Sequence, residues 1–440
     1  MIEICAVGGF NEIGKNMTAV KVDDEVIILD MGIYLPVIIN MEEEERINIS
    51  RKQLIELGAI ADDDVIKDWK HKVKAIVLGH CHLDHIAGIP FLAPHYDAPI
   101  IATPFTLEVL KTTLKDDDKI IPNKLKPLNI NSSIKISKNI TIEFINITHS
   151  TLQCVMIAIH TPYGVVLYAN DCKFDDHPVI GQKPNYKRLK QLNGNVKVII
   201  LESLYAHKEG KTPSEKVAKE MLKDVMLGIK NTGNAIFVTT FASHIARLKS
   251  ILEFGRKLNR KVVFLGRSMA KYINAAEKLD LIKFSKSSEI FPFRNQINKQ
   301  LQKIEQDRGK YLVICTGSQG EPGSILDKIV KKQLSFEFIH GDQVIFSCRT
   351  IPVEINEANR EMLEAKLKQL KVRIFTDIHV SGHSSKEDLR DLIKTVAPEN
   401  IIPAHCDSFK ANSLAELAIE EGYEIDKNIH IMGNGKRITI

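Results

Sequence analysis

The sequence predicts an α/β protein built from at least two domains, and three observations support this. The chain has 440 residues, enough for two or three compact domains. Its first part contains apolar runs separated by short polar turns, which is typical of strands joined in hairpins. From about residue 207 onward, short apolar runs alternate with helical patterns, and such alternation favours a mostly parallel sheet covered by helices.

In the first part, two hairpins and one buried strand are predicted. An acidic turn at Asp23-Asp24-Glu25 separates two apolar runs, the second of which ends at Asp30. A second hairpin is expected around Thr161-Pro162-Tyr163-Gly164. The apolar run at 72–80 predicts a buried strand that ends on a histidine, and a helix is expected after Asp84.

Residues 36–72 differ from their surroundings. They include an acidic run from Glu42 to Glu45 and are otherwise polar. We expect a helical surface insertion here.

In the second part, Thr212-Pro213-Ser214-Glu215 fits a capping box with proline at the first helical position. The following helix is expected to bury one face carrying Val217, Met221, Val225 and Met226.

Composition excludes some functional classes and leaves others open. The formal net charge of +5 permits nucleic acid as a partner without arguing for it. No apolar run approaches the roughly 20 residues of a membrane span, so no membrane association is expected. The seven cysteines are scattered and form no C-x-x-C pair, which predicts a reducing, cytoplasmic setting.

The segment from His80 to His85 predicts a metal centre. It places His80, His82, Asp84 and His85 within six residues, directly after a predicted strand. In an extended chain, residues two apart face the same way, so His80 and His82 can bind one ion. Asp84 and His85 would turn back with the helix and serve a second ion. Imidazole and carboxylate ligands suit zinc or a similar divalent cation.

Further ligands are expected at the ends of other predicted strands. His149, Asp171 and His405 occupy such positions. Asp30 is placed to orient a ligating imidazole through its carboxylate. Cys81, Cys172 and Cys406 adjoin proposed ligands, but neighbouring residues on a strand point to opposite faces, so thiolate ligation is not favoured.

Taken together, these motifs resemble the β-CASP branch of the metallo-β-lactamase superfamily, and within it the ribonuclease J family, especially its archaeal members. The resemblance spans essentially the whole chain. It rests on the following segments: Gly8-Gly9 with Glu12 to Asn16, Asp30, His80 to His85, His149, Asp171 with Lys173-Phe174-Asp175, Glu202, Thr316 to Pro322, His379 to His383, and Pro403-Ala404-His405.

The resemblance implies a role for each matching residue. His80, His82 and His149 would bind one zinc ion, Asp84, His85 and His405 a second, and Asp171 would bridge them. Two Zn²⁺ per chain are therefore expected, with Mn²⁺ or Mg²⁺ as the alternative. Asp84 is also expected to be catalytic. Glu202, His383 and His405 match the three β-CASP motifs.

The resemblance also implies a domain layout. A metallo-β-lactamase αββα sandwich would be formed by residues 1–206 and 375–440, with a β-CASP α/β domain inserted at 207–374. Neither the C-terminal domain of bacterial members nor the N-terminal KH modules of other archaeal relatives is expected in this chain.

The implied reaction is hydrolysis of RNA phosphodiester bonds. His383 is expected to donate a proton to the leaving 3′ oxygen while Glu202 keeps the imidazole basic.

Two stretches rich in glycine and serine offer exposed backbone N–H groups to an anion. In the ribonuclease J family that this chain resembles, these segments form a pocket for the 5′-monophosphate of RNA. The resemblance therefore implies that Gly317, Ser318, Ser381 and Gly382 contact that phosphate, with Arg267 as a further candidate. Such contacts would make the enzyme a 5′-to-3′ exonuclease that prefers 5′-monophosphate ends.

Other functions remain in competition. An endoribonuclease would use the same residues. A small-molecule metallo-hydrolase would share the histidine cluster without needing Glu202 and His383. DNA-specific β-CASP relatives tend to carry valine where this chain has His405, which favours RNA. A binding subunit without activity would have lost metal ligands, and none is missing here. Single-stranded RNA is the expected partner, and a homodimer is compatible with the sequence.

Overall fold

The computed structural model describes residues 1–39, 41, 49–229, 233–351 and 353–440. By contacts within the chain, these residues form two compact units. Unit 1 comprises Met1–Asp176, Gly181–Thr212 and Ser381–Ile440, and unit 2 comprises His177–Ile180 and Pro213–Val380. None of the described helices is long and apolar enough to cross a bilayer.

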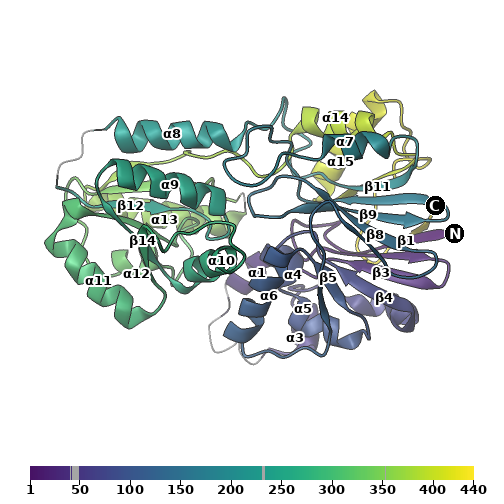
Figure 1. The fold of residues 1–440 in the computed structure, drawn as a ribbon, viewed down its shortest axis with the longest axis horizontal. Coiled ribbons are helices and arrows are strands. Elements are labelled where there is room, and N and C mark those ends of the chain that lie inside the picture. The colour runs from purple at the N-terminus through teal and green to yellow at the C-terminus, as the bar shows by residue number, and fades with distance from the viewer. Residues whose placement is uncertain (40, 42–48, 230–232, 352) are drawn as a thin grey trace. The chain divides into compact units, whose positions relative to one another are not determined.

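Unit 1 contains two mixed sheets. The first has seven strands in the spatial order β19 (Arg437–Thr439), β1 (Ile2–Gly8), β2 (Met17–Val22), β3 (Glu25–Leu29), β4 (Val73–Val77), β5 (Ile100–Ala102) and β6 (Leu125–Pro127). The second has six strands in the order β18 (Ile401–Ala404), β11 (Val196–Glu202), β10 (Gly164–Ala169), β9 (Val155–Thr161), β8 (Thr141–Asn146) and β7 (Ser133–Lys135). Because β1 pairs with β19, the two ends of the chain lie side by side (Figure 1).

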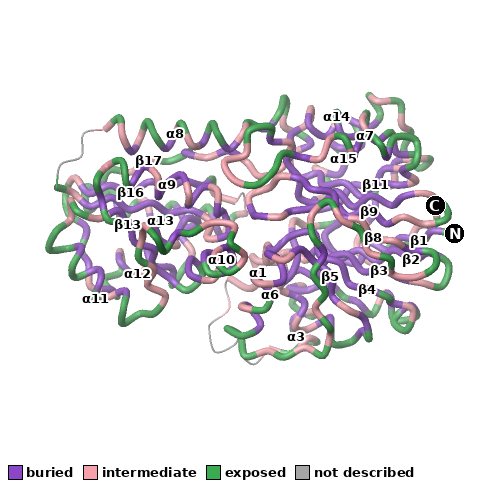
Figure 2. The backbone as a smooth tube through the Cα atoms, in the orientation of Figure 1, coloured by how far each residue is buried: buried purple, intermediate pink, exposed green. Residues whose placement is uncertain are grey.

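The core of unit 1 lies between these sheets. Alternate residues of both sheets supply it, for example Ile4 and Val20 from the first and Phe144 and Ile157 from the second. The central strands are accordingly buried along their length (Figure 2). This alternation is what two stacked sheets require, because every second side chain of a strand points to the same face.

Helices cover the outer faces of both sheets. The second sheet packs against α7 (Tyr186–Gln191), α14 (Lys386–Val396) and α15 (Ser408–Glu420) (Figure 1). The other helices in the described part of unit 1 are α1 (Leu35–Ile39), α3 (Arg51–Glu56), η1 (Asp63–Lys72), α4 (Leu83–Ile86), α5 (Ile89–Leu92), η2 (Ala93–His95) and α6 (Pro104–Asp116). The predicted metallo-β-lactamase αββα sandwich is thereby confirmed.

Unit 2 contains one wholly parallel sheet. Its order is β14 (Ser288–Phe291), β13 (Lys261–Leu265), β15 (Tyr311–Cys315), β12 (Ile236–Thr239), β16 (Gln343–Phe346) and β17 (Arg373–Phe375). Its helices are α8 (Glu215–Leu227), α9 (Ile245–Lys257), α10 (Arg267–Lys278), α11 (Arg294–Gln306), η3 (Arg308–Lys310), α12 (Ile325–Val330) and α13 (Glu354–Gln369). The prediction of a parallel sheet covered by helices is confirmed.

Most local predictions hold. Both hairpins form, β2 with β3 and β9 with β10. The single helix expected after Asp84 is instead broken into α4, α5 and η2. The described part of 36–72 contains the helices α1, α3 and η1, but residues 57–62 are not helical. Leu54, Ile66 and Trp69 are buried, so the expected surface location is wrong for these residues, and the acidic run at 42–45 lies outside the described residues.

The predicted start of α8 is wrong. Ser214 is the N-cap and its side chain accepts from Lys216 N, whereas the Thr212 hydroxyl lies 2.7 Å from the His383 carbonyl oxygen. The predicted buried face is also wrong except for Met226. The helix buries Ala218 and Leu222, and Val217 is exposed. Because the apolar residues of this helix are dense enough to fit two adjacent faces, only packing selects between them.

Candidate metal centre and active site

The proposed metal ligands all follow the carboxyl ends of strands in unit 1. His80 and His82 come after β4, and His149 after β8. Asp171 follows β10, and His405 follows β18. Strands that end at one edge of the sandwich thus bring together residues up to 325 positions apart (from His80 to His405) in the sequence.

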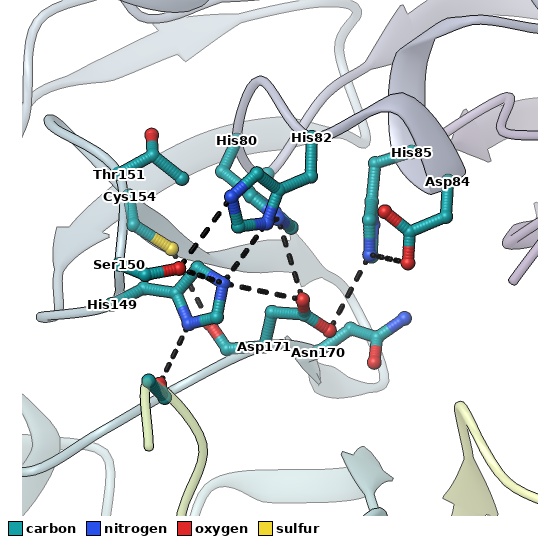
Figure 3. Close-up of polar contacts among 12 residues, drawn as sticks. His80, His82, Asp84, His85, His149, Ser150, Thr151, Cys154, Asn170 and Asp171 are labelled. Atoms are coloured by element: carbon teal, nitrogen blue, oxygen red, sulfur yellow. Dashed lines mark hydrogen bonds and ion pairs between the residues drawn. The ribbon is translucent and has the colours of Figure 1, made fainter. Parts of the chain in front are cut away.

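The first cluster consists of His80, His82, His149 and Asp171 (Figure 3). His82 Nδ1 lies 3.0 Å from His80 Nε2 and 3.1 Å from His149 Nε2. Asp171 Oδ2 lies 3.3 Å from His80 Nε2 and 3.4 Å from His149 Nε2. A tetrahedral zinc site with ordinary Zn–N bonds has ligand-to-ligand edges of about 3.4 Å. The four donors are therefore spaced to surround one such ion.

The second cluster consists of Asp84, His85, Asp171 and His405. His85 Nε2 lies 3.4 Å from Asp171 Oδ1 and 3.6 Å from Asp84 Oδ2. His405 Nε2 lies 3.7 Å from Asp171 Oδ1 and 3.9 Å from Asp84 Oδ2. Asp171 thus turns one carboxylate oxygen toward each cluster.

Hydrogen bonds on the far side of the rings fix their orientation. His85 Nδ1 lies 2.7 Å from Asp30 Oδ2, and His149 Nδ1 lies 2.6 Å from the Gly382 carbonyl oxygen. These oxygens only accept, so each Nδ1 donates its proton and leaves a lone pair on Nε2. That lone pair faces carboxylate oxygens in both cases, an arrangement that is repulsive unless a cation or a proton lies between the two atoms.

Asp171 Oδ1 supports the same conclusion. It is buried, and no group among the described residues donates a hydrogen bond to it. Buried polar atoms almost always have a partner. Together with the spacing of the donors, this shows that the residues present fit a divalent cation in each cluster.

The electrostatics also suit metal ligands. Burial lowers the pKa of His82 and His149 well below the usual range, which keeps both imidazoles neutral. Burial disfavours the charged form of Asp171, but the surrounding imidazoles, His405 and His85 foremost, outweigh it and hold the pKa of this carboxyl well below its ordinary value. Neutral imidazole and ionised carboxylate are the ligating forms.

Three residues of the site have a left-handed backbone. Asp30, Asp171 and His405 have φ of 57°, 53° and 54°. This conformation costs a non-glycine residue on the order of 1 kcal/mol and is enriched at functional sites. It turns each side chain out of its strand direction toward the two clusters.

Sequence reasoning missed two supporting residues. Tyr168 donates to Asp30 Oδ2 at 2.8 Å, and Asn16 Oδ1 lies 3.0 Å from His405 Nδ1. Tyr168 had no sequence signal beyond its position in an apolar strand. Asn16 belongs to the segment Gly8 to Asn16, on which the family resemblance partly rests, and that was a signal for a role at the site.

Beside the clusters lies a carboxylate–imidazole pair. His383 Nδ1 is 2.6 Å from Glu202 Oε2. The other oxygen of Glu202 accepts from the backbone N–H groups of Cys172 and Ser384 at 2.9 and 3.2 Å. Burial alone would lower the pKa of His383, but Glu202 and then Asp171 outweigh it and raise the pKa to about 9. Glu202, His383 and Asp171 each have a potential ligand atom, and these three atoms lie close enough together to hold a metal ion.

The candidate phosphate residues are spread over both units. In unit 2, Gly317 has a φ of 122°, and a Cβ there would lie 2.5 Å from Leu326 Cβ, so glycine is required. Ser318 is buried and its carbonyl oxygen accepts from Arg360. Arg267 begins α10.

In unit 1, the predicted contacts have structural partners of their own. Ser381 Oγ accepts from His383 N at 3.0 Å. The Gly382 carbonyl is the acceptor for His149, and a Cβ at Gly382 would lie 3.0 Å from His149 Nδ1. Ser381 therefore helps to position His383, and Gly382 helps to position His149.

The cysteines next to the ligands point elsewhere. Cys81 Sγ lies 3.2 Å from the Thr151 hydroxyl, and Cys172 Sγ lies 3.7 Å from the Ser384 hydroxyl. No cysteine belongs to a potential metal cluster in the described part of the chain.

Comparison with known proteins agrees with this site. Residues 64–223 match the model of a β-lactamase superfamily domain, residues 233–364 that of a ribonuclease J β-CASP domain, and residues 369–432 that of a Zn-dependent metallo-hydrolase RNA specificity domain. A crystal structure of a protein of unknown function from Enterococcus faecalis has the same fold, with a TM-score of 0.66, 19% identity, and full coverage of both chains. Fold and site together define a β-CASP metallo-hydrolase.

Close relatives narrow the class further. Ribonuclease J of Methanocaldococcus jannaschii is 44% identical over 100% of this chain and 98% of its own length. Ribonuclease J of Pyrococcus abyssi is 45% identical over 100% of this chain and 97% of its own. Ribonuclease J 1 of Streptococcus pyogenes is 32% identical over 100% of this chain and 74% of its own. The chain belongs to the ribonuclease J family.

Proposed function

We propose that this nuclease is a two-zinc 5′-to-3′ exoribonuclease that prefers single-stranded RNA with a 5′-monophosphate. Membership of the ribonuclease J family supports RNA hydrolysis. The observation that carries the two-ion proposal is Asp171, whose two oxygens face two separate groups of ligands. Mn²⁺ or Mg²⁺ is the alternative to zinc.

In this proposal His80, His82 and His149 would bind one ion, and Asp84, His85 and His405 would bind the other. Asp171 would offer one oxygen to each ion, and Asp30 would orient His85. Bound divalent ions would lower the pKa of a water molecule and neutralise charge on the scissile phosphate. Asp84 would help to orient that water.

The departing 3′ oxygen of the RNA needs a proton. We assign this role to His383, because its Nδ1 is held by Glu202, so that Nε2 would be the atom that gives the proton to the substrate. Glu202 is fully buried and its Oε1 accepts two backbone N–H groups, so it fixes the ring without moving itself.

Preference for the 5′ end requires phosphate contacts. We propose Gly317, Ser318 and Arg267 in unit 2, and Ser381 and Gly382 in unit 1, as such contacts. Backbone N–H groups in glycine-rich turns and serine hydroxyls are suited to phosphate oxygens. Ser318→Ala and Ser381→Ala should each reduce the preference for monophosphate over triphosphate ends. An unchanged preference would remove that residue from the proposal.

The remaining organisation is part of the same proposal. Residues 1–206 and 375–440 would be the metallo-β-lactamase domain, and 207–374 the β-CASP domain. All seven cysteines are buried and none forms a disulfide, which supports a reducing, cytoplasmic setting. A homodimer is the proposed assembly, to be checked by light scattering.

A defined RNA substrate tests the activity. Single-stranded RNA with a 3′ label is incubated with zinc-loaded protein, carrying either a 5′-monophosphate or a 5′-triphosphate, with a chelator as control. Stepwise shortening from the 5′ end, faster on the monophosphate and abolished by chelation, supports the proposal. Discrete internal cuts that ignore the 5′ end would make the protein an endoribonuclease. If RNA is not cleaved with Zn²⁺, Mn²⁺ or Mg²⁺, both the exoribonuclease and the endoribonuclease functions are overturned.

A further inference from the structure

A row of aromatic rings leads from His383 to the protein surface. It consists of Tyr205, His207 and Phe409, all in unit 1. Tyr205 and His207 follow β11, and Phe409 lies in the first turn of α15, four residues after His405. None of the three was singled out by the sequence motifs.

The rings are in successive contact. The centroid of His383 is 5.9 Å from that of Tyr205, with the rings nearly perpendicular at 85°. Tyr205 is 6.2 Å from His207, and His207 is 5.5 Å from Phe409. Such distances are typical of aromatic pairs that stabilise one another's position. The proposed proton donor is thus connected to the surface by three ring-to-ring steps.

The outer end of this row is exposed. The Phe409 side chain retains 63% of its accessible surface, the largest exposed fraction of any phenylalanine described in the chain. The buried face of α15 is made by other residues, namely Ala411, Leu414, Ala415, Leu417 and Ala418. Packing of the helix therefore does not require Phe409.

The surroundings of the row carry positive charge. The Lys208 ammonium lies 3.3 Å from the centre of the Tyr205 ring. Lys410 is adjacent to Phe409 in sequence and pairs with Asp407. Burial, with Lys208 and then Lys410 nearby, lowers the pKa of His207, so this imidazole is uncharged near neutral pH. An uncharged ring flanked by lysines suits contact with a base and an adjoining phosphate.

We propose that Phe409, His207 and Tyr205 form a stacking platform for a nucleobase of the single-stranded RNA substrate, beside the scissile phosphodiester. Exposed aromatic rings interleaved with lysines are the surface that proteins use to bind single-stranded RNA without reading its sequence. The inference rests on the proposed function and deepens it, because it places one base of the substrate on α15.

Substitution of Phe409 tests the platform. Phe409→Ala should raise the KM for RNA by roughly 5- to 100-fold, the range expected for loss of one base–aromatic stack. Phe409→Trp should restore the KM to about the wild-type value, because indole stacks at least as well. The matched controls are Ile419→Ala, an exposed apolar residue on the same helix, and Phe293→Ala, an exposed phenylalanine in unit 2. Neither control should change the KM.

RNA with a single abasic nucleotide, placed at each position in turn, identifies the stacked base. An abasic nucleotide at one position should weaken RNA binding to the wild-type protein as much as Phe409→Ala does. The same abasic nucleotide should cause no further loss of RNA binding in the Phe409→Ala variant. If wild-type protein degrades RNA but Phe409→Ala keeps the wild-type KM, the platform is overturned while the proposed function stands. If Phe409→Trp does not restore the wild-type KM, base stacking is excluded as the cause of the raised KM in Phe409→Ala. If the wild-type protein does not degrade RNA, both the stacking platform and the proposed function are overturned.

Discussion

Replacing Asp30 by asparagine tests how the second ion is held. The Asp30 carboxylate is fully buried and accepts three hydrogen bonds. Its Oδ2 accepts from His85 Nδ1 at 2.7 Å and from the Tyr168 hydroxyl at 2.8 Å, and its Oδ1 accepts from Gly79 N at 2.9 Å. Asparagine has nearly the same shape but only one accepting oxygen, so at least one donor loses its partner in either orientation of the amide.

The expected loss can be estimated from these contacts. A carboxylate that accepts from a ligating histidine fixes the ring and makes it a stronger ligand, and its removal usually weakens metal binding about 10- to 100-fold. Only His85 among the proposed ligands is held by Asp30. We therefore expect one zinc ion to bind about 10- to 100-fold more weakly, which is roughly 1.4–2.7 kcal/mol, while the other ion is unaffected.

Competition with a chromophoric zinc chelator measures this effect. The wild-type protein should release two ions, and Asp30→Asn should show one of them in a separate, weaker class. Tyr168→Phe is the matched control, because it removes one donor and leaves the carboxylate in place, and its effect should be smaller. The buried Trp69 reports by fluorescence whether unit 1 remains folded. If both ions of the folded variant keep the wild-type affinity, Asp30 does not support His85 as argued.

Three further predictions follow from the same contacts. His383→Gln should lower turnover by about 100-fold or more with unchanged zinc content, and normal turnover would exclude His383 as the proton donor. Removal of zinc by chelation should lower the melting temperature, because ions that bind the folded chain and not the unfolded chain stabilise the folded state; an unchanged melting temperature would contradict metal binding there. Burial, with Arg247 nearby, lowers the pKa of His379 to about 2, so the imidazole stays neutral in the folded protein while the unfolded chain takes up a proton below about pH 6.5. The free energy of unfolding of unit 2 should therefore fall as the pH drops below about 6.5, by up to about 1.4 kcal/mol per pH unit. Hydrogen exchange of β12 and β15 measures this dependence, and His379→Gln should make it less steep. Equal pH dependence in the wild-type protein and in His379→Gln would refute this prediction.

The sequence alone was sufficient where the information is local. The spacing of His80, His82, Asp84 and His85 predicts a metal centre, because extended and helical backbones present side chains at fixed intervals. The hairpins at β2–β3 and β9–β10 follow from turn residues between apolar runs. The alternation after residue 207 predicts a parallel sheet, because parallel strands need a crossover connection.

Local patterns were misleading at α8. Both Thr212 and Ser214 are good caps, and two adjacent faces of the helix are apolar. The choice depends on tertiary contacts: Thr212 hydrogen-bonds to the His383 carbonyl oxygen, while Glu215 turns inward to pair with the buried Arg247. No window of sequence contains these partners.

The sequence by itself determined which side chains are candidate metal ligands and which segments form the strands that carry them. Only the tertiary structure decided that Asp171 faces both clusters, that Gly382 holds His149, and that Tyr205 and Phe409 extend the site to the surface. The physical reason is the range of the interactions. Turn chemistry and periodicity act over a few residues, whereas these contacts join residues up to 234 positions apart, as for Asp171 with His405. They exist only once the strand order of the two sheets has brought these residues together.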